Sequence, residues 1–359
     1  MQGVRSDKPD ADLPRHVGIT VRAARQDDRQ RWDGFVHSHP EGSFFHLFDW
    51  QVIFPEVFGL GPHYLVAERG GALVGILPLV HQKSILFGNA FISTPFCVHG
   101  GPLTLDQAAS DALDQAAMTL TKDRGAKSLE YRGRRATRPD WTAKKGLYAT
   151  FTRDMAADDQ QNLLLIPRKQ RAVVRKALQG DLFSSIGKDV PAFFRVYSKS
   201  MRNLGTPMFP RRYFDCLLNT FPENCDIVII RQAYEPVSGV LNFYFKDTVL
   251  PYYGGGTAAA RQNGANDLMY WEVMRNAVGR GYKRFDFGRS KAGTGAFAFK
   301  KNWGFEPNWL EYEYWLRDGG AVPEKNPTNP LYANLSKVWK MLPLPVANFI
   351  GPFLIRGLG

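Results

Sequence analysis

The residues best suited to chemistry gather in one segment, FDFGRSKAGTGAFAFKKNWGF, at positions 285–305. Glycines follow a predicted strand end, and they allow a ligand to approach the backbone closely. Exposed N–H groups at such a turn can hold an anion, or the oxygen of an acyl group under attack. Asp286 can accept or orient the proton of an attacking amine, and Arg289 and Lys300 can pair with phosphate or carboxylate. We therefore predict Asp286, Arg289 and Lys300 as catalytic residues.

The same segment also fits a plain strand-to-helix turn with an aromatic core and solvated charges. If it is instead a binding site, the small and aromatic residues around the three charges would contact substrate. The predicted substrate-binding residues here are Gly288, Ser290, Gly293, Thr294 and Trp303.

A second cluster is basic and lies on a predicted helix, PRKQRAVVRK at 167–176. Proline suits the start of a helix, and the cations gather on two sides away from an apolar face. No acidic residue interrupts the run before Asp181. Unpaired cations near a helix start favour a phosphate-bearing ligand, whereas the alternative is a solvated basic face. The predicted substrate contacts are Arg168, Lys169, Arg171 and Arg175.

Two predicted turns complete the candidate site. RNLGTP at 202–207 offers Arg202 and Thr206, and YYGGG at 252–256 ends a predicted strand. Two tyrosines beside a glycine run can form a cleft wall in which the hydroxyls donate hydrogen bonds. The alternative for YYGGG is a flexible turn. The residues predicted to bind substrate from this run are Tyr252, Tyr253 and Gly254.

The signatures of several enzyme classes are missing. The sequence has no G-x-S-x-G, H-E-x-x-H or G-x-x-x-x-G-K-[ST] motif. Its seven histidines lie between positions 16 and 99 without metal-ligand spacing, so no metal site is predicted. Its three cysteines form no C-x-x-C pair, and an odd number argues against a disulfide framework. Chemistry based on binding and positioning fits better than a metal or a nucleophilic triad.

Composition points to a globular protein with anionic partners. The chain has 359 residues, 44% of them hydrophobic, which suits two domains of moderate size. Its net charge of +12 and pI near 9.6 favour nucleic acid, phosphorylated substrates or an acidic membrane surface. The first residues are polar, without the apolar core of a signal peptide, and no apolar run reaches the ~18–20 residues of a spanning helix. We expect a cytoplasmic protein, with a peripheral position on the inner membrane as an option.

The elements that must position these residues alternate between strands and helices. We predict an α/β (α+β) fold with two lobes, each a mixed, mostly antiparallel sheet flanked by helices. In both lobes the predicted order along the chain is helices, a hairpin, a long helix that ends at a glycine (Gly125 or Gly281), and a strand. This shared order suggests a structural duplication. The predicted divisions are a flexible N-terminus at 1–17, a first lobe at 18–150, a second lobe with the main site at 151–318, and an amphipathic tail at 319–359.

The tail differs from the lobes in composition. Three prolines mark a linker, 331–342 has apolar residues at helical spacing with Lys337 and Lys340 elsewhere on the helix, and 343–359 is apolar but interrupted by Pro and Gly. Such a tail fits either an anionic membrane surface or the body of the protein itself.

Taken in order, these motifs resemble the FemAB-related proteins. In the second unit the likeness rests on LIPRKQRAVVRKA, MRNLGTPMFPRRYF, YYGGG and the 285–305 segment. In the first unit the likeness rests on GSFFHLFDWQ, LVGILPLV and FISTPFCVHGGPL. Together they cover about residues 20–318, and they most resemble the branch found with exosortase and PEP-CTERM sorting systems.

The resemblance implies two GNAT-like lobes with a cleft between them. It also implies transfer of an aminoacyl group from aminoacyl-tRNA to an amine of a peptidoglycan precursor, or the use of acyl-CoA as in the wider superfamily. The sequence departs from both patterns. RGRRAT has the charges but not the glycines of the Q/R-x-x-G-x-G/A loop for acetyl-CoA, and 180–230 leaves no room for the helical arm of many tRNA-using members. The acyl donor, aminoacyl-tRNA or acyl-CoA, stays open, and no other cofactor is predicted.

Three functions compete at this point. The first is an N-acyltransferase or aminoacyltransferase acting on an anionic small-molecule or lipid-linked precursor of the envelope or of an exopolysaccharide. The second is a catalytically inactive, membrane-peripheral binding or assembly factor that meets the inner membrane through 331–359. The third, non-specific nucleic-acid binding by 168–176, lacks interleaved aromatic residues, and no specific DNA binding is expected.

Overall fold

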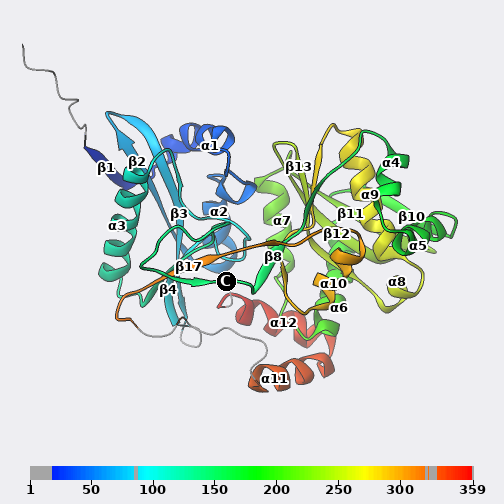
Figure 1. Cartoon of the computed structure of the whole chain (residues 1–359). Coiled ribbons are helices and arrows are strands. Elements are labelled where there is room, and N and C mark those ends of the chain that lie inside the picture. The colour runs from blue at the N-terminus through cyan, green and yellow to red at the C-terminus, as the bar shows by residue number, and fades with distance from the viewer. Residues whose placement is uncertain (1–17, 85–87, 320–321, 323–329, 358–359) are drawn as a thin grey trace, which may run out of the picture.

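The computed structural model describes residues 18–84, 88–319, 322 and 330–357. Two lobes lie side by side, and each is a sheet with helices on both of its faces (Figure 1). Most of the predicted linker and the whole predicted flexible N-terminus lie outside the described residues.

The first lobe begins with strand and helix segments close to those predicted. The hairpin forms around Gly70 and Gly71, and Gly125 follows the long helix with φ at 62°, as its predicted role in closing that helix requires. In chain order its elements are β1 (Ile19–Ala23), η1 (Gln26–Asp28), α1 (Arg29–Ser38), η2 (Phe44–His46), α2 (Trp50–Ile53), η3 (Phe54–Phe58), β2 (Gly61–Arg69), β3 (Ala72–Ser84), β4 (Gly88–Ser93), β5 (Leu103–Thr104), α3 (Gln107–Asp123), β6 (Ser128–Tyr131) and β7 (Thr142–Lys144).

The second lobe repeats the plan with additional short elements. The predicted basic helix begins at Arg168, directly after Pro167. In chain order the elements are β8 (Tyr148–Thr150), β9 (Thr152–Asp154), α4 (Asp159–Leu165), α5 (Arg168–Leu178), β10 (Leu182–Gly187), α6 (Val190–Leu204), α7 (Arg211–Thr220), β11 (Cys225–Gln232), β12 (Glu235–Phe245), β13 (Thr248–Gly256), α8 (Ala258–Gln262), α9 (Ala265–Gly279), β14 (Arg284–Asp286), β15 (Ser290–Lys291), α10 (Gly295–Asn302), β16 (Asn308–Trp309) and β17 (Tyr312–Leu316).

The two main sheets have matching strand orders. The first runs β1-β2-β3-β4-β6-β17-β7, and the second runs β10-β11-β12-β13-β14-β9. In each sheet the strand after the long helix is parallel to its neighbour: β6 to β4 through Leu129 and Phe91, and β14 to β13 through Phe285 and Val249. The other pairings along these two paths are antiparallel. This agreement supports the predicted duplication.

One strand pairs outside its predicted lobe. Residues 312–316 fall within the second lobe predicted at 151–318, but β17 pairs with β6 and β7 of the first sheet. Conversely, β9 comes directly after the first lobe in the chain and completes the second sheet beside β14. Side-chain alternation identifies a strand but not its partner. The chain passes from the first sheet to the second between β7 and β9, and it returns to the first sheet at β17.

The largest hydrophobic cluster lies between the lobes. It joins aromatic residues of η2 and α2 to strands and helices of the second lobe, and the rings of Phe44 and Phe243 stack at 4.4 Å. Separate clusters lie under α3 in the first lobe and under α9 in the second. Because the lobes share a core, residues at their seam have fixed relative positions.

The tail forms two helices, α11 (Pro330–Met341) and α12 (Leu344–Ile355), beneath the lobes in Figure 1. The predicted helix at 331–342 is confirmed. The apolar part beyond it was predicted to be interrupted, but α12 continues through Gly351 and Pro352. Its N-terminal Pro345 lies in the first turn, where the missing N–H removes no intrahelical bond.

Candidate active site at the seam between the lobes

A loop of the first lobe, at 94–99, meets two tyrosines at the seam. The hydroxyl of Tyr252 in β13 donates to the carbonyl of Phe96 at 3.2 Å. The hydroxyl of Tyr312 in β17 donates to the carbonyl of Val98 at 2.8 Å. Thr94 and Phe96 have positive φ of 53° and 68°, which is uncommon for residues with a side chain. The loop thus has an unusual backbone held in place by contacts from other strands.

Arg289 binds to this seam from the second lobe. Its Nη1 donates to the Tyr312 hydroxyl at 3.0 Å, and its guanidinium lies 4.6 Å from the centre of the Tyr148 ring. Gly288, directly before it, has φ at 68°, a conformation that favours glycine. The turn after β14 therefore directs a permanent positive charge between the two lobes.

Lys300 in α10 points back at the same turn. Its side chain is buried, and Nζ donates to the carbonyl of Gly288 at 2.8 Å and to that of Arg289 at 3.3 Å. Burial lowers the pKa of the Lys300 amine to about 7, against the attraction of Asp286 and with some help from the charge of Arg289. An amine with this pKa can give or take a proton near neutral pH.

Asp286 is the third member of the group. One of its carboxylate oxygens accepts the backbone N–H of Gly288 at 2.8 Å. Burial raises the pKa of the carboxyl, although that hydrogen bond and the charge on Lys300 oppose the rise. The structure thus brings together the three predicted catalytic residues around one backbone turn, where an amine and a carboxyl have pKa values shifted toward each other.

Ser290 is the polar residue next to this group. It is buried, and its hydroxyl has no hydrogen-bond partner within the described part of the chain. Buried hydroxyls are normally hydrogen-bonded, so the missing partner sets this oxygen apart, and the predicted binding role of Ser290 remains a prediction.

The predicted basic helix lies elsewhere. α5 packs on α9 at the far side of the second lobe (Figure 1). Arg168, Lys169 and Arg175 are exposed, and the half-buried Arg171 donates to the carbonyl of Leu164 at 3.2 Å. Within the described ranges, no hydrogen bond, ion pair or ring contact joins these cations to Asp286, Arg289 or Lys300. The start of α5 nevertheless lies beside the end of α10, because a Cβ on Gly304 would come 3.0 Å from Cδ of Pro167. The predicted binding role of the four cations remains a prediction.

The RNLGTP turn lies against the tail. Nη1 of Arg202 donates to the carbonyls of Lys340 and Leu342 at 3.3 and 3.5 Å. A Cβ on Gly205 would come within 2.1 Å of the Ser336 hydroxyl oxygen, so only glycine fits there. Thr206 is exposed at the same turn. These contacts give the motif a role in seating α11.

The YYGGG run is part of β13 and not a flexible turn. Tyr253 is buried in the core, where its hydroxyl pairs with that of Tyr213 at 2.8 Å. A Cβ on Gly255 would lie 2.8 Å from Cβ of Ser200, because α6 packs closely on the strand. Gly254 pairs with Val240 of β12. Of this run, Tyr252 reaches the seam loop through its own side chain.

The remaining predicted contacts surround α10. Trp303 is fully buried and its indole N–H donates to Asp267 at 2.9 Å, as a core residue would. Thr294 caps α10 by accepting the Phe297 N–H, and Gly293 lies exposed before it with φ at 76°. Their predicted binding role remains a prediction.

Sequence reasoning missed the two tyrosines that contact Arg289. Tyr148 and Tyr312 hold Arg289, yet both sit in short or alternating strands with no local mark of function. His99 and Arg132 line a small hollow of about 30 Å³ beside the seam together with Arg134. The unpaired Nδ1 of buried His99, for which burial lowers the pKa well below its usual value, marks this hollow as polar.

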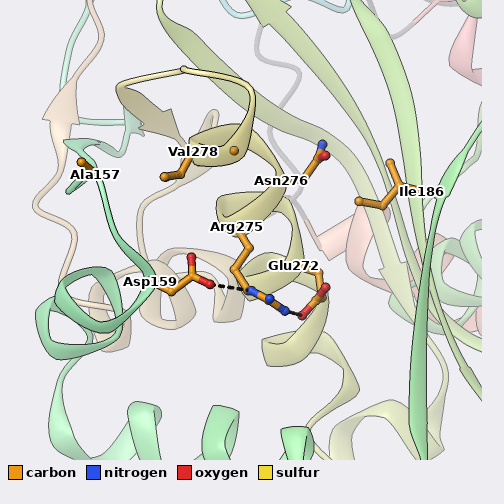
Figure 2. Close-up of a pocket in the computed structure, with 8 residues that line it drawn as sticks. Ala157, Asp159, Ile186, Glu272, Arg275, Asn276 and Val278 are labelled. Atoms are coloured by element: carbon orange, nitrogen blue, oxygen red, sulfur yellow. Dashed lines mark hydrogen bonds and ion pairs between the residues drawn. The ribbon is translucent and has the colours of Figure 1, made fainter.

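A larger hollow, about 590 Å³, lies away from the seam on the outer side of α9 (Figure 2). Its centre is Arg275, which forms ion pairs with Asp159 at 2.9 Å and Glu272 at 3.1 Å. Since those charges already neutralise one another on an open surface, we place the reaction at the seam.

The N-terminus of α9 is closed to ligands. Helix N-termini near strand ends commonly bind phosphate. Here Gly264, with φ at 77°, lies so close to α5 that a Cβ would come 3.0 Å from the Val173 side chain. The carboxyl of Asp267 in the first turn accepts hydrogen bonds from Trp303 and Gln170. Protein groups therefore fill the position that a phosphate would need.

Metal and thiol chemistry find little support among the described residues. No group of three His, Cys, Asp or Glu side chains in the described ranges could hold a metal ion. Cys97, Cys216 and Cys225 are free and buried, and burial raises the pKa of each thiol above its usual value.

Comparison with known proteins supports the architecture. The profile of the acetyltransferase (GNAT) domain matches residues 168–301, from α5 to α10. No curated protein sequence matches the chain.

Several solved structures share the two-lobed fold. The crystal structure of FemX superposes with a TM-score of 0.65 at 16% identity, over 88% of this chain and 100% of that one. The C-terminal domain of a putative lysylphosphatidylglycerol synthetase from Agrobacterium fabrum gives 0.54 at 13% identity, over 87% and 94%. A tandem GNAT protein from the clavulanic acid biosynthesis pathway gives 0.54 at 12%, over 85% and 99%. At these identities the likeness establishes the fold, and the predicted two GNAT-like lobes are confirmed.

Proposed function

We propose that this two-lobed GNAT-like protein is an N-acyltransferase or aminoacyltransferase. The main support is the buried Lys300 amine, which has a pKa of about 7 and lies at the turn after β14 beside Asp286 and Arg289. The GNAT profile and the FemX-like fold support the same reaction class. We further propose that the acceptor is an amine of a cell-envelope or exopolysaccharide precursor, in an exosortase or PEP-CTERM setting, on the strength of the sequence motifs.

The reaction places specific demands on these residues. The acceptor nitrogen forms a bond to the acyl carbon, and the bond from that carbon to the donor oxygen or sulfur breaks. The amine loses a proton and the leaving group gains one, while negative charge develops on the acyl oxygen. Charge of this kind is stabilised best by donors that are already in place.

Lys300 suits the donor role. A protonated lysine has three N–H bonds, and backbone carbonyls take two of them. We propose that the third serves the acyl oxygen or the leaving group, although Nζ also lies 5.4 Å from the centre of the Phe151 ring. Asp286 suits the role of proton acceptor, because its raised pKa makes the carboxylate a stronger base than a solvated aspartate.

Arg289 suits the binding of an anionic group of the substrate. Its charge is fixed by Tyr312 and Tyr148 and has no carboxylate partner within 4 Å among the described residues. This agrees with a precursor that carries phosphate or carboxylate. The closed N-terminus of α9 favours a donor whose phosphate, if it has one, binds elsewhere.

The test is a transfer assay with the full chain. tRNA charged with labelled amino acids and a panel of acyl-CoAs serve as donors, and amine-bearing peptidoglycan and exopolysaccharide precursors serve as acceptors. We expect one donor class to label an acceptor, with transfer lost in Lys300→Met and kept in Lys301→Met. Failure of both donor classes, or equal transfer by wild type and Lys300→Met, would contradict the proposal.

The competing function, a catalytically inactive assembly factor, does not require a buried ionisable amine at position 300. It predicts that Lys300→Met behaves like wild type in every assay. The same pair of variants therefore separates the two functions.

A further inference from the structure

The tail helices pack on the body through residues of different sizes: Trp339 of α11 is buried, and Leu354 and Ile355 of α12 pack against the same core cluster. Ala347 and Gly351 are the buried residues of α12, and a Cβ on Gly351 would come 3.2 Å from the backbone nitrogen of Met208. The end of α12 also binds the first lobe: Gln82 donates to the carbonyl of Arg356 at 2.7 Å. The orientation of α12 is thus set by contacts with both lobes.

This orientation turns large apolar side chains outward. Val346, Phe349, Ile350 and Phe353 follow the spacing of one helix face, and all four are exposed. Phe349 and Phe353 keep 72% and 70% of their surface exposed. In a helix that served only to cover the protein, the large residues would face the core and the small ones would face water. In α12, Leu354 and Ile355 do pack on the core, but the two largest side chains, Phe349 and Phe353, face outward.

The other tail helix, α11, also exposes large apolar side chains. Leu335, Val338 and Met341 are exposed on α11, and Met341 has 75% of its surface exposed. Both tail helices thus expose several large apolar side chains, and clustered apolar side chains on a surface mark interaction sites.

Charge identifies the occupant. From position 325 to 359 the sequence has no Asp or Glu, but it has Lys325, Lys337, Lys340 and Arg356. Lys337, Lys340 and Arg356 are exposed. A second copy of this chain would bring like charges together across a symmetric contact, whereas an anionic bilayer offers both apolar depth and negative headgroups.

We propose that α11 and α12 form a docking surface for an anionic membrane. We call the exposed side chains Leu335, Val338, Met341, Val346, Phe349, Ile350 and Phe353 the tail surface. No helix among the described residues has the length and apolar character needed to cross a bilayer, so this contact lies in the plane of the headgroups. The proposal does not depend on the acyl-transfer function.

The test uses the full chain and vesicles of two compositions, phosphatidylcholine alone and phosphatidylcholine with phosphatidylglycerol. In flotation we expect binding to the anionic vesicles that weakens as salt rises. The double variant Phe349→Ser/Phe353→Ser should bind at least roughly tenfold more weakly, because both rings insert into the interface. Lys337→Glu/Lys340→Glu should lose the preference for anionic vesicles.

A matched control comes from the opposite part of the second lobe. Phe183 in β10 has 66% of its surface exposed, and Phe183→Ser should bind vesicles like wild type. Equal thermal unfolding temperatures for wild type and the serine variants would show that folding is intact. Wild type that stays unbound on anionic vesicles, or a phenylalanine double variant that binds like wild type, would overturn the proposal. Dimerisation through Phe349 and Phe353 without vesicle binding would assign the surface to a second copy instead.

Discussion

The two lobes carry an acid at the same place in their sheets but surround it differently. Glu130 follows the residue of β6 that pairs with Phe91 of β4, and Asp286 follows the residue of β14 that pairs with Val249 of β13. Glu130 forms an ion pair with the buried Arg132 at 2.8 Å. Asp286 forms no ion pair with any described residue and accepts a backbone N–H.

The difference extends to the neighbouring cations. In the first lobe, Arg138 forms ion pairs with Asp114 at 2.6 Å and with Glu313 at 3.0 Å, and all three side chains are largely buried. In the second lobe, Lys300 and Arg289 have backbone carbonyls and tyrosines as partners. The same architecture thus holds charges that neutralise each other at this place in the first lobe, and charges without an ion-pair partner among the described residues at Asp286, Arg289 and Lys300 in the second.

The largest expected effect is on catalysis in the second lobe. Lys300→Met should lower the acyl-transfer rate by about 10²–10³-fold, because a positioned donor is lost at the developing negative charge. The assay is the transfer reaction described above. Lys301→Met removes an exposed lysine from the next position in α10 and should keep the rate within about twofold of wild type. A similar loss in both variants would assign the effect to α10 as a whole.

The next effect is on stability in the first lobe. Arg138→Ala should lower the free energy of unfolding by about 3–5 kcal/mol, because Glu313 and Asp114 would be left buried without their cation. Chemical denaturation measures this change. The control is Arg284→Ala in the second lobe, which breaks a more exposed pair with Asp154 and should cost no more than about 1 kcal/mol. Equal costs would remove the contrast between the lobes.

Exchanging the equivalent acids for amides should separate their roles. Asp286→Asn should reduce transfer by about tenfold or more without loss of stability at pH 7, because burial already disfavours the charged carboxylate. Glu130→Gln should leave transfer unchanged and cost about 1–3 kcal/mol, since buried Arg132 loses its counter-charge. Transfer rates and denaturation curves for both variants decide the point. A reversed pattern would place the reaction in the first lobe.

The pH dependence of stability provides a smaller effect. The pKa of Lys300 falls from 10.5 in the unfolded chain to about 7 in the folded chain. Between these values the unfolded state binds more protons, so this group makes the protein more stable as pH rises. Wild type should therefore gain stability relative to Lys300→Met, by up to about 1.4 kcal/mol per pH unit, between pH 7 and 10.5. Parallel stability curves for the two proteins over this range would contradict the lowered pKa.

The fold was largely predictable because its signals are local. Apolar spacing and glycine positions gave the long helices α3 and α9, the hairpins and the repeated plan of the lobes. The place of β17 in the first sheet was not predictable, because it depends on pairing with β6, whose residues lie more than 100 positions away. Periodicity contains no information about such partners.

The site was predictable in part for the same reason. Asp286, Arg289 and Lys300 lie within 15 positions, so one turn brings them together. Tyr148 and Tyr312 come from other strands and had no local signal. The cations of α5 make no contact with these three residues among the described parts of the chain, so a basic run in the sequence does not by itself locate a site.

The central claim is that the second lobe keeps an ionisable amine uncompensated at its strand end. Its most direct test is NMR titration of the full chain labelled with ¹³C at the lysine Cε, from pH 5 to 11, with the Lys300 signal identified by its absence in Lys300→Met. We predict a midpoint near 7 for Lys300 in the wild type. A midpoint near the ordinary lysine value of about 10.4 would contradict the account.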